Sequence, residues 1–493
     1  MSQAQPHSSG TESRSNRTLP VKASKAPRPM RILAAIASYG TGNDVYLAQL
    51  VKQYRSMPFA VDIVVLSNLP KEVGSGVEVV VGLPSKNPWS LPFAHKRIFA
   101  ERLEHYDLFI YSEDDILITE RNIRAFLLAS EVLPTDEIAG FLRFETDRNS
   151  DVHFADALGA FHWDPSWVKV RGRQTFSFFT NEHAAAYILT QQQLQRAIAS
   201  GGFLVAPYEG KYDMLVTAAT DPYTRCGMKK VISISSVDDF MVHHLSNKYI
   251  GKFGVTKAEF YRQIDALLKV KESDRRRALF TTETRLPHRV YSKVFYEPVR
   301  SEVLSLVPDG ARDVLSIGCG WGAMEASLIA KGMRVVGIPL DSVIGACAEA
   351  RGVEIIAEDF EAARSKLAGK RFDVLLMSNV LHLVSNPSDV LSSFASLLHR
   401  NSVAIIVVPN LASLPARRRI LGKRPYRKLR GYEKLGIQLT SHRMIRRWLH
   451  NAGLQMEHTT RVLSRGAQKI SRATLRLFDP LFAEEIIVLA RKT

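Results

Sequence analysis

The sequence predicts an α/β protein built from two domains. Its 493 residues exceed what a single hydrophobic core usually supports. Two separate runs of alternating strand and helix patterns begin at Met30 and at Asp313. Such an alternation is typical of a mostly parallel sheet with helices on its faces.

The first run starts with apolar segments that predict buried strands, separated by segments with helical spacing of apolar residues. A helix before the fourth strand, for example, has Phe99, Leu103 and Tyr106 on one face. We expect strands at 32–38, 61–67 and 77–83, and helices at 44–56 and 94–106.

We expect four segments along the chain. Residues 1–29 are Ser-rich, basic and poor in large apolar side chains, which predicts a disordered tail. The first α/β domain covers 30–250 and is rich in aromatic residues in its second half. A charged helical linker at 251–300, with a hinge at 271–277, leads to the second α/β domain at 301–493.

The composition describes a globular protein with a basic bias. Lys and Arg number 66 against 49 Asp and Glu, a net charge of +17 that favours anionic partners such as nucleotide phosphates, phospholipid surfaces or nucleic acid. Alternatively, the excess of basic residues lies in a solvated tail and on solvated faces of helices and has no specific partner. Three cysteines without metal-ligand spacing, no secretory signal and no membrane span predict a cytoplasmic protein, with the inner face of the membrane as an additional location.

Three adjacent acids, Glu113, Asp114 and Asp115, follow the apolar residues 108–110. Ligands of α/β sheets bind at the carboxyl ends of strands, which is where these acids stand. Neighbouring carboxylates repel one another, and a hard divalent cation such as Mg²⁺ or Mn²⁺ removes that conflict. A solvated turn after a strand is the alternative.

The stretch YSEDDILI after a β/α/β start resembles the acidic metal motif of GT-A type glycosyltransferases, over residues 30–250. The resemblance implies a nucleotide-sugar-binding domain in which Asp115 is the principal Mn²⁺ or Mg²⁺ ligand, supported by Glu113 and Asp114. Relatives often supply a histidine late in the domain. His243 is preferred here over His244, and a structural histidine is the alternative.

The loop 37–44 follows the first strand and suits a nucleotide pocket, in which Ser38 and Tyr39 would contact the nucleotide sugar; a plain βα turn is the alternative. Gly40 and Gly42 allow close backbone approach there. The basic residues 95–97 are candidates for neutralising the diphosphate, or else a solvated basic face.

An inverting transferase needs a carboxylate base near the acceptor hydroxyl. Asp213 and Glu209 are the candidates, and Asp238 and Asp239 compete with them; a retaining enzyme needs no such base. Trp163 and Trp167 are candidates for stacking on sugar rings, with core packing as the alternative.

In the second domain a predicted strand leads into Gly318, Gly320 and Gly322, and a helix follows. Glycines let the backbone pass close to a ligand, and a helix N-terminus offers free N–H groups. Further strands are expected at 334–341, 353–360, 373–380 and 403–410.

This order resembles class I S-adenosylmethionine-dependent methyltransferases, with a nicotinamide-binding Rossmann domain as the rival. The resemblance implies a Rossmann-like fold that binds S-adenosylmethionine, with the glycines at its methionine part and Asp359 by the adenine. Ser316 and Pro339 stand where relatives carry acids, so Asp341 is expected to take the ribose. His382 is a candidate base or a packing residue.

Together these features predict a bifunctional glycan-modifying enzyme, joining metal-dependent sugar transfer to methylation in polysaccharide or glycolipid synthesis. The donor would be a nucleotide sugar and the acceptor a glycan or lipid-linked glycan. The basic stretch 415–432 would face such an anionic acceptor or a membrane surface, and nucleic acid is the less favoured partner. The alternative is a methyltransferase of RNA or protein with a non-catalytic N-terminal module.

Overall fold

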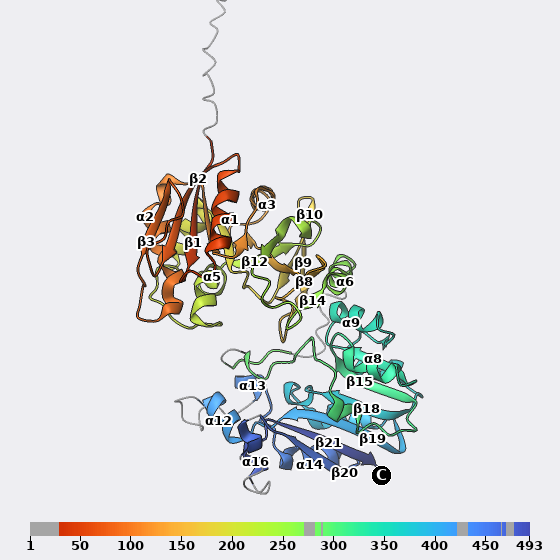
Figure 1. Cartoon of the computed structure of the whole chain (residues 1–493). Helices are drawn as coiled ribbons and strands as arrows, with labels where there is room; N and C mark the ends of the chain where they lie inside the picture. The colour runs from red at the N-terminus through yellow and green to blue at the C-terminus, as the bar shows by residue number, and fades with distance from the viewer. Residues whose placement is uncertain (1–28, 271–281, 287–288, 422–431, 465, 470–477) are drawn as a thin grey trace, which may run out of the picture.

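The computed structural model describes most of the chain and consists of two α/β bodies joined by a segment that runs between them (Figure 1). The expected tail at 1–29 and hinge at 271–277 lie outside the described residues, except for Pro29. The described ranges are 29–270, 282–286, 289–421, 432–464, 466–469 and 478–493.

The first body is organised around a five-stranded sheet with the order β11-β4-β1-β2-β3. Four strands are parallel and β11 is antiparallel to β4, because its chain returns from the second half of the domain. Near-continuous apolar runs such as ILAAIA in β1 fit a sheet buried on both faces. The strands are β1 (Arg31–Ser38), β2 (Ala60–Ser67), β3 (Val77–Val81), β4 (Leu108–Glu113) and β11 (Ala186–Thr190).

Three of the five helices named here, α3, α4 and α5, begin at side chains that cap their free N–H groups. Thr119 and Thr190 start α3 and α4 with reciprocal capping boxes, and Asp213 caps α5. The helices are α1 (Asp44–Arg55), α2 (Ala94–Glu101), α3 (Glu120–Ser130), α4 (Gln191–Ala199) and α5 (Met214–Thr224), and the 3₁₀ helix η1 (Pro88–Phe93) precedes α2.

Two smaller sheets complete the first body, with the orders β6-β12-β10-β9 and β14-β8-β7-β13-β5. Asp114 and Asp115 form the turn between β4 and β5, so they lie where the large sheet gives way to the second of these small sheets. The strands are β5 (Ile116–Leu117), β6 (Glu137–Ala139), β7 (Leu142–Thr146), β8 (Val152–Phe154), β9 (Trp163–Arg171), β10 (Gln174–Phe179), β12 (Lys229–Ser233), β13 (Met241–His244) and β14 (Val255–Thr256).

The expected helical linker at 251–300 contains one long described helix, α6 (Lys257–Leu268). Its Phe260 and Ile264 belong to the core of the first body, where α6 packs on β8, β9 and β14, and it also packs on α9 (Ser342–Glu349) of the second body. Residues 289–298 contain turns and no α-helix or strand, and they lead toward the second sheet.

The second body contains a seven-stranded sheet with the order β17-β16-β15-β18-β19-β21-β20. Only β21 runs antiparallel to its neighbours. The carboxyl ends of β15, β16 and β18 therefore meet at one edge. The strands are β15 (Asp313–Cys319), β16 (Arg334–Pro339), β17 (Glu354–Ile355), β18 (Phe372–Ser378), β19 (Leu398–Pro409), β20 (Leu454–Val462) and β21 (Glu485–Lys492).

Helices pack on the second sheet in the alternation that the sequence predicts. A tripeptide 3₁₀ turn, η6 (Leu381–Leu383), follows β18. The helices are α7 (Ser301–Leu304), α8 (Ala323–Ile329), α9 (Ser342–Glu349), α10 (Phe360–Lys366), α11 (Pro387–Ala395), α12 (Leu414–Leu421), α13 (Tyr432–Leu435), α14 (His442–Asn451) and α16 (Asp479–Phe482).

The two bodies contact each other chiefly through α6 and α9, which lie side by side (Figure 1). Val343 and Ile344 of α9 join the hydrophobic core of the first body, and Arg351 forms an ion pair with Glu259 of α6. Within the described ranges, no helix has the length and apolarity needed to cross a bilayer. All three cysteines are free and buried.

Candidate functional sites

The three adjacent acids point to different partners. Asp114 is tied to the loop after β1, because its Oδ2 accepts a hydrogen bond of 2.6 Å from Ser38 Oγ and its Oδ1 one of 2.7 Å from Asn43 Nδ2. Ser38 thus lies beside the acids, as the sequence predicts. Asn43 has the same role but was missed, because one amide in a loop has no distinctive pattern.

Asp115 faces a histidine from the neighbouring strand β13. His244 Nε2 lies 3.0 Å from Asp115 Oδ2, and its Nδ1–H donates to Glu145 Oε1 at 2.6 Å. Burial alone would lower the pKa of His244, but these two carboxylates outweigh it and raise that pKa. Burial likewise opposes ionisation of Asp115, and His244 holds the Asp115 pKa below its usual value.

The structure corrects the choice between the two histidines. His243 precedes His244 on β13, and successive strand residues point to opposite faces. His243 stacks on Phe144 at 4.8 Å and lies near Asn247, away from the three acids. The expected metal-binding histidine is therefore His244 by position.

Glu113 is the acid whose charge is least compensated. Its Oε1 is shielded from solvent and has no hydrogen-bond partner among the described residues. Burial, reinforced by the charge of Asp115, raises the pKa of Glu113 to about 7. A buried carboxylate oxygen without a partner fits a cation, which would satisfy the oxygen and favour its charged form.

The carboxylate oxygens of Glu113, Asp114 and Asp115 are suitable ligands for a divalent cation, but they do not form a complete coordination site. Within the described part of the chain, no three His, Cys, Asp or Glu side chains converge as ready metal ligands. Asp114 and Asp115 already hold hydrogen bonds, whereas Glu113 does not. Glu113 and Asp115 are the acids that would hold a cation here.

A cavity of about 280 Å³ opens beside the acids. Two exposed aromatic side chains, Tyr39 and Trp89, line it with Glu113 and Lys248. Tyr39 was predicted, but Trp89 and Lys248 were not, because their segments, η1 and the loop after β13, reach the cavity only through the fold. The combination of acids, a lysine and exposed rings at one sheet edge suits a charged ligand with a flat ring.

The proposed bases, Asp213 and Glu209, are not among the residues that line this cavity. Asp213 is exposed and caps α5 by accepting from Val216 N at 2.9 Å. Glu209 is exposed on the preceding loop. Leu215, two residues after Asp213, lines the cavity with the acids.

The basic run at 95–97 does not face the acids. His95 is buried between Pro92 O and Tyr187 Oη, and Lys96 forms a buried ion pair with Asp221. Arg97 is exposed and pairs with Glu101. Their expected role at a diphosphate is therefore wrong, because α2 turns its buried face into the core.

The competing acids and the tryptophans also have structural partners. Asp239 pairs with Arg121, and Asp238 accepts from Tyr261 Oη. Trp163 is buried in the core of the first body, so it is unable to stack on a sugar. Trp167 packs partly buried beneath the ammonium of Lys169, 4.3 Å from its ring centre.

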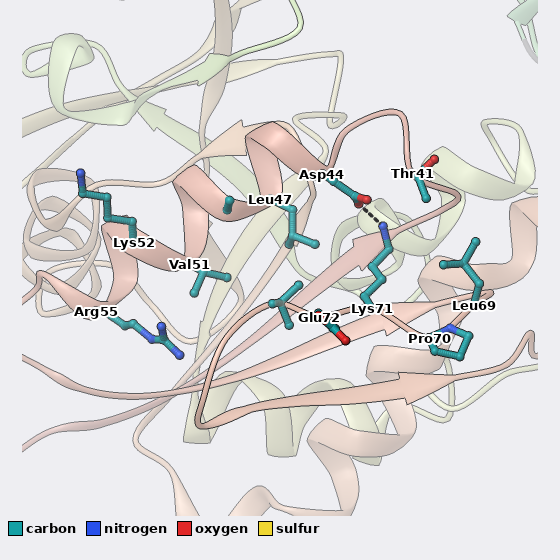
Figure 2. A pocket seen from close by; sticks show the side chains of 12 residues that line it. Thr41, Asp44, Leu47, Val51, Lys52, Arg55, Leu69, Pro70, Lys71 and Glu72 are labelled. Atoms are coloured by element: carbon teal, nitrogen blue, oxygen red, sulfur yellow. Dashed lines mark hydrogen bonds and ion pairs between the residues drawn. The ribbon is translucent and has the colours of Figure 1, made fainter.

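A larger cavity of about 530 Å³ lies beside α1 (Figure 2), and the three adjacent acids are not among the residues that line it. Lys71 lines this cavity and binds both Asp44 and the carbonyl of Gly40. Lys71 thereby fixes the loop that carries Tyr39. The apolar side chains of Leu47 and Val51 point into this cavity, which contains no cluster of acids (Figure 2).

In the second body, the glycine turn has the backbone that its glycines allow. Gly318 and Gly322 have φ angles of 72° and 85°, and Gly322 caps α8. Ser316, which replaces an expected acid, donates to Glu325 Oε1 at 2.7 Å. Glu325 thus brings a carboxylate to the strand end, a substitution hidden from sequence because the two positions lie nine residues apart.

The two expected cofactor acids act as helix caps in this structure. Asp341 is buried, and its Oδ1 accepts from Val343 N and Ile344 N, both at 2.8 Å. Asp359 caps α10 through Ala362 N. Burial raises the pKa of Asp341, and that of His382 is lowered by burial to about 4. His382 Nε2 donates to Tyr291 O, so it is a packed core residue.

The cleft over the glycine turn is filled by the segment that enters the second body. Phe295 O accepts a hydrogen bond of 3.0 Å from Trp321 N, and a Cβ at Gly320 would overlap that carbonyl oxygen. The space that remains is about 20 Å³. A cofactor site usually needs roughly 300 Å³ or more. In this conformation the residues do not fit S-adenosylmethionine.

Comparison with known families identifies the second body. Residues 288–459 match a family profile described as a methyltransferase domain. The sheet order, with one antiparallel strand, and the glycine turn after its first strand agree with this match. These findings support a methyltransferase domain in the C-terminal body, as the sequence predicts.

Solved structures similar to the chain cover only part of it. An S-adenosylmethionine-dependent methyltransferase from Mesorhizobium loti is 17% identical, covers 39% of this chain and 96% of its own, with a TM-score of 0.30. Magnesium protoporphyrin IX methyltransferase from Synechocystis PCC 6803 is 19% identical over 39% of this chain and 77% of its own, with a TM-score of 0.27. No curated protein matches the chain.

Proposed function

We propose that the N-terminal domain is a GT-A-like, metal-dependent glycosyltransferase domain whose sugar product or its carrier is methylated by the C-terminal domain. The observation that carries this proposal is the partnerless carboxylate of Glu113, beside Asp115, in a cavity with two exposed aromatic rings. The negative charge of Glu113 at the end of β4 has no compensating partner, which favours binding of a cation. The bound cation in turn favours an anionic ligand.

Each lining residue has a part in this proposal. Glu113 and Asp115 hold the divalent cation, and Asp114 fixes the loop of Ser38 and Tyr39 through its hydrogen bonds. The cation, when bound, stabilises the negative charge of the departing nucleotide diphosphate. His244 is oriented by Glu145, as histidines near metals commonly are, so that its Nε2 points at Asp115.

The remaining residues at the cavity would bind the nucleotide-sugar donor, and an acid near it in sequence would act as the base. Tyr39 and Trp89 stack on the flat base or the sugar face, and Lys248 supplies positive charge to the diphosphate. Asp213 remains the candidate base of an inverting reaction, ahead of Glu209, because it is close in sequence to the lining residue Leu215. The acceptor we propose is a glycan or lipid-linked glycan.

The basic surface supports an anionic acceptor or a peripheral contact with an anionic membrane. Arg417, Arg418 and Arg419 of α12 belong to the basic stretch at 415–432, of which residues 422–431 lie outside the described residues. Adjacent arginines on one short helix favour phosphate-bearing partners over neutral ones.

A thermal-shift panel tests the N-terminal assignment. We expect Mn²⁺ together with one nucleotide diphosphate sugar to raise the melting temperature, and Asp115→Asn to weaken that joint binding at least about 100-fold, as loss of a metal ligand does. Asp239→Asn is the matched control, because Asp239 pairs with Arg121 outside the cavity. Equal donor binding by wild type and Asp115→Asn would contradict the role of Asp115.

The competing function is a methyltransferase of RNA or protein with an N-terminal binding module. It predicts no Mn²⁺-dependent release of nucleotide from any sugar donor. Hydrolysis of a nucleotide sugar that requires Mn²⁺ and Asp115 would exclude it.

A further inference from the structure

The segment 291–298 crosses the carboxyl ends of β15 and β18, where the methyltransferase domain has its glycine turn. Three of its residues, spaced two apart, hold it there. Lys293 Nζ donates to Ser378 O at 2.7 Å, Phe295 O accepts from Trp321 N at 3.0 Å, and Glu297 O accepts from Trp321 Nε1 at 2.8 Å. The segment is therefore bonded to both strand ends and does not merely pass over them.

This packing leaves no room for a ligand. The remaining cavity of about 20 Å³ has room for about one water molecule, which needs about 10–15 Å³ of such volume. Gly320 has no side chain, and the space that a Cβ would take is occupied by the backbone of Phe295. The close approach that the glycine permits is thus used by the chain itself.

The segment also brings a pair of opposite charges into the cleft. The buried Lys293 ammonium lies 2.8 Å from the Glu297 carboxylate, and both act electrostatically on the buried Glu325. An ammonium and a carboxylate are the two charged groups of the amino-acid part of S-adenosylmethionine. The segment therefore presents the cleft with the same two kinds of charge.

The N-terminal domain holds the other side of this segment. Phe295 N donates to Gly159 O at 2.7 Å, and the Phe295 ring stacks on His162 with centroids 4.1 Å apart. Tyr296 Oη donates to Gln263 of α6 at 3.1 Å. The closed position of the segment consequently depends on both domains.

We propose that residues 291–298 form a self-inhibitory plug of the methyltransferase domain, and that S-adenosylmethionine enters only when this plug leaves the ends of β15 and β18. The proposal rests on the methyltransferase assignment alone and is independent of sugar transfer. Because the N-terminal domain anchors the plug through Gly159, His162 and Gln263, a change at that interface would alter access to the cofactor site.

The plug lowers the apparent affinity for the cofactor by the fraction of molecules in which it is open. Weakening its bond to β18 raises that fraction. Lys293→Met keeps the length and apolar stem of the side chain and removes the ammonium that binds Ser378 O. We expect it to tighten cofactor binding by about 10-fold or more, since a lost charge-assisted hydrogen bond shifts such an equilibrium by about that factor.

The experiment is calorimetric titration of the full-length chain with S-adenosylmethionine, for wild type, Lys293→Met and the exposed-lysine control Lys331→Met. Melting curves establish that each variant is folded. Hydrogen exchange of the wild type, with and without saturating cofactor, reports directly on the plug. We expect faster exchange at 293–298 with cofactor bound, and the affinity of Lys331→Met to equal that of wild type.

Three outcomes would overturn the proposal. Weaker binding by Lys293→Met would make Lys293 a cofactor ligand instead of a plug residue. Cofactor binding to the wild type without a change of exchange at 293–298 would show that the site lies elsewhere. Absence of binding to folded wild type and folded Lys293→Met alike would make the filled cleft permanent. None of these outcomes depends on Mn²⁺ or a sugar donor, so they are separable from failure of the N-terminal assignment.

Discussion

The two sheet edges that carry the predicted sites differ in what fills them. At the carboxyl end of β4, a cavity of about 280 Å³ remains beside a carboxylate oxygen that no described residue satisfies. At the carboxyl end of β15, polar groups are paired and about 20 Å³ remains. A motif at a strand end therefore identifies where a ligand can bind, whereas the packing around it decides whether that place is open.

Of these predictions, the largest effect is on turnover at the open site, after removal of the candidate base Asp213. We expect Asp213→Asn to lower sugar-transfer turnover by about 10²–10⁴-fold with donor binding intact. Asparagine is as good a helix cap as aspartate, so the start of α5 is preserved. Turnover with saturating donor, beside donor affinity by calorimetry, checks this. Unchanged turnover would transfer the role to Glu209 or favour a retaining mechanism.

Adding a methyl group should destabilise the protein at the filled end of β15 but not in the loop near the open cavity. Gly320→Ala places a Cβ against Phe295 O, so we expect it to lower the free energy of unfolding by about 1–3 kcal/mol. Gly42→Ala in the loop after β1 is the matched control, because nothing lies within 4 Å of its Cβ position. Urea unfolding of both variants measures the difference. Equal stability would mean that the segment at Phe295 is readily displaced.

Removing the uncompensated charge at the open edge should stabilise the metal-free protein. The pKa of Glu113 is about 7 against an ordinary value of 4.5, so stability is lost as pH rises through this interval and the charge forms. We expect Glu113→Gln to raise the free energy of unfolding by about 1–2 kcal/mol at pH 8 and to have little effect near pH 4.5. A destabilised variant at pH 8 would indicate that the charge of Glu113 is already satisfied.

The smallest effect concerns the pH dependence of cation binding. Below about pH 7 Glu113 holds a proton that a cation must displace. We therefore expect the apparent Mn²⁺ affinity to fall about 10-fold between pH 8 and pH 6. Electron paramagnetic resonance titrations of free Mn²⁺ measure it. Glu113→Gln, which carries no proton to displace, should lose most of this dependence.

The sequence predicted the α/β class and a methyltransferase-like second domain, because strand runs, helix spacing and glycine turns are local signals. It did not separate His243 from His244, since that choice depends on which face of β13 meets Asp115. It placed Lys96 at a ligand, although α2 buries it against Asp221. Trp89 and Lys248 were missed because only the fold brings their loops to the acids.

Asp341 shows why the role of a residue cannot be predicted from its position in the sequence alone. The residue lies near the predicted ribose position, yet its carboxylate is used up by the first turn of α9. Phe295 was not singled out at all, because nothing about a single aromatic residue in a linker indicates that its carbonyl will meet a glycine turn. Long-range backbone contacts of this kind have no sequence pattern.

The helix α6 has one consequence for how this protein can be divided. Phe260 and Ile264 complete the core of the first domain, while the same helix packs along α9 of the second. A gene fragment that ends before α6 would leave a hole in one domain and an uncovered apolar face on the other. During evolution, one domain could be exchanged between two-domain proteins of this kind only if the chain were broken after Leu268. The helix α6 would then be inherited together with the first domain, whose core it fills.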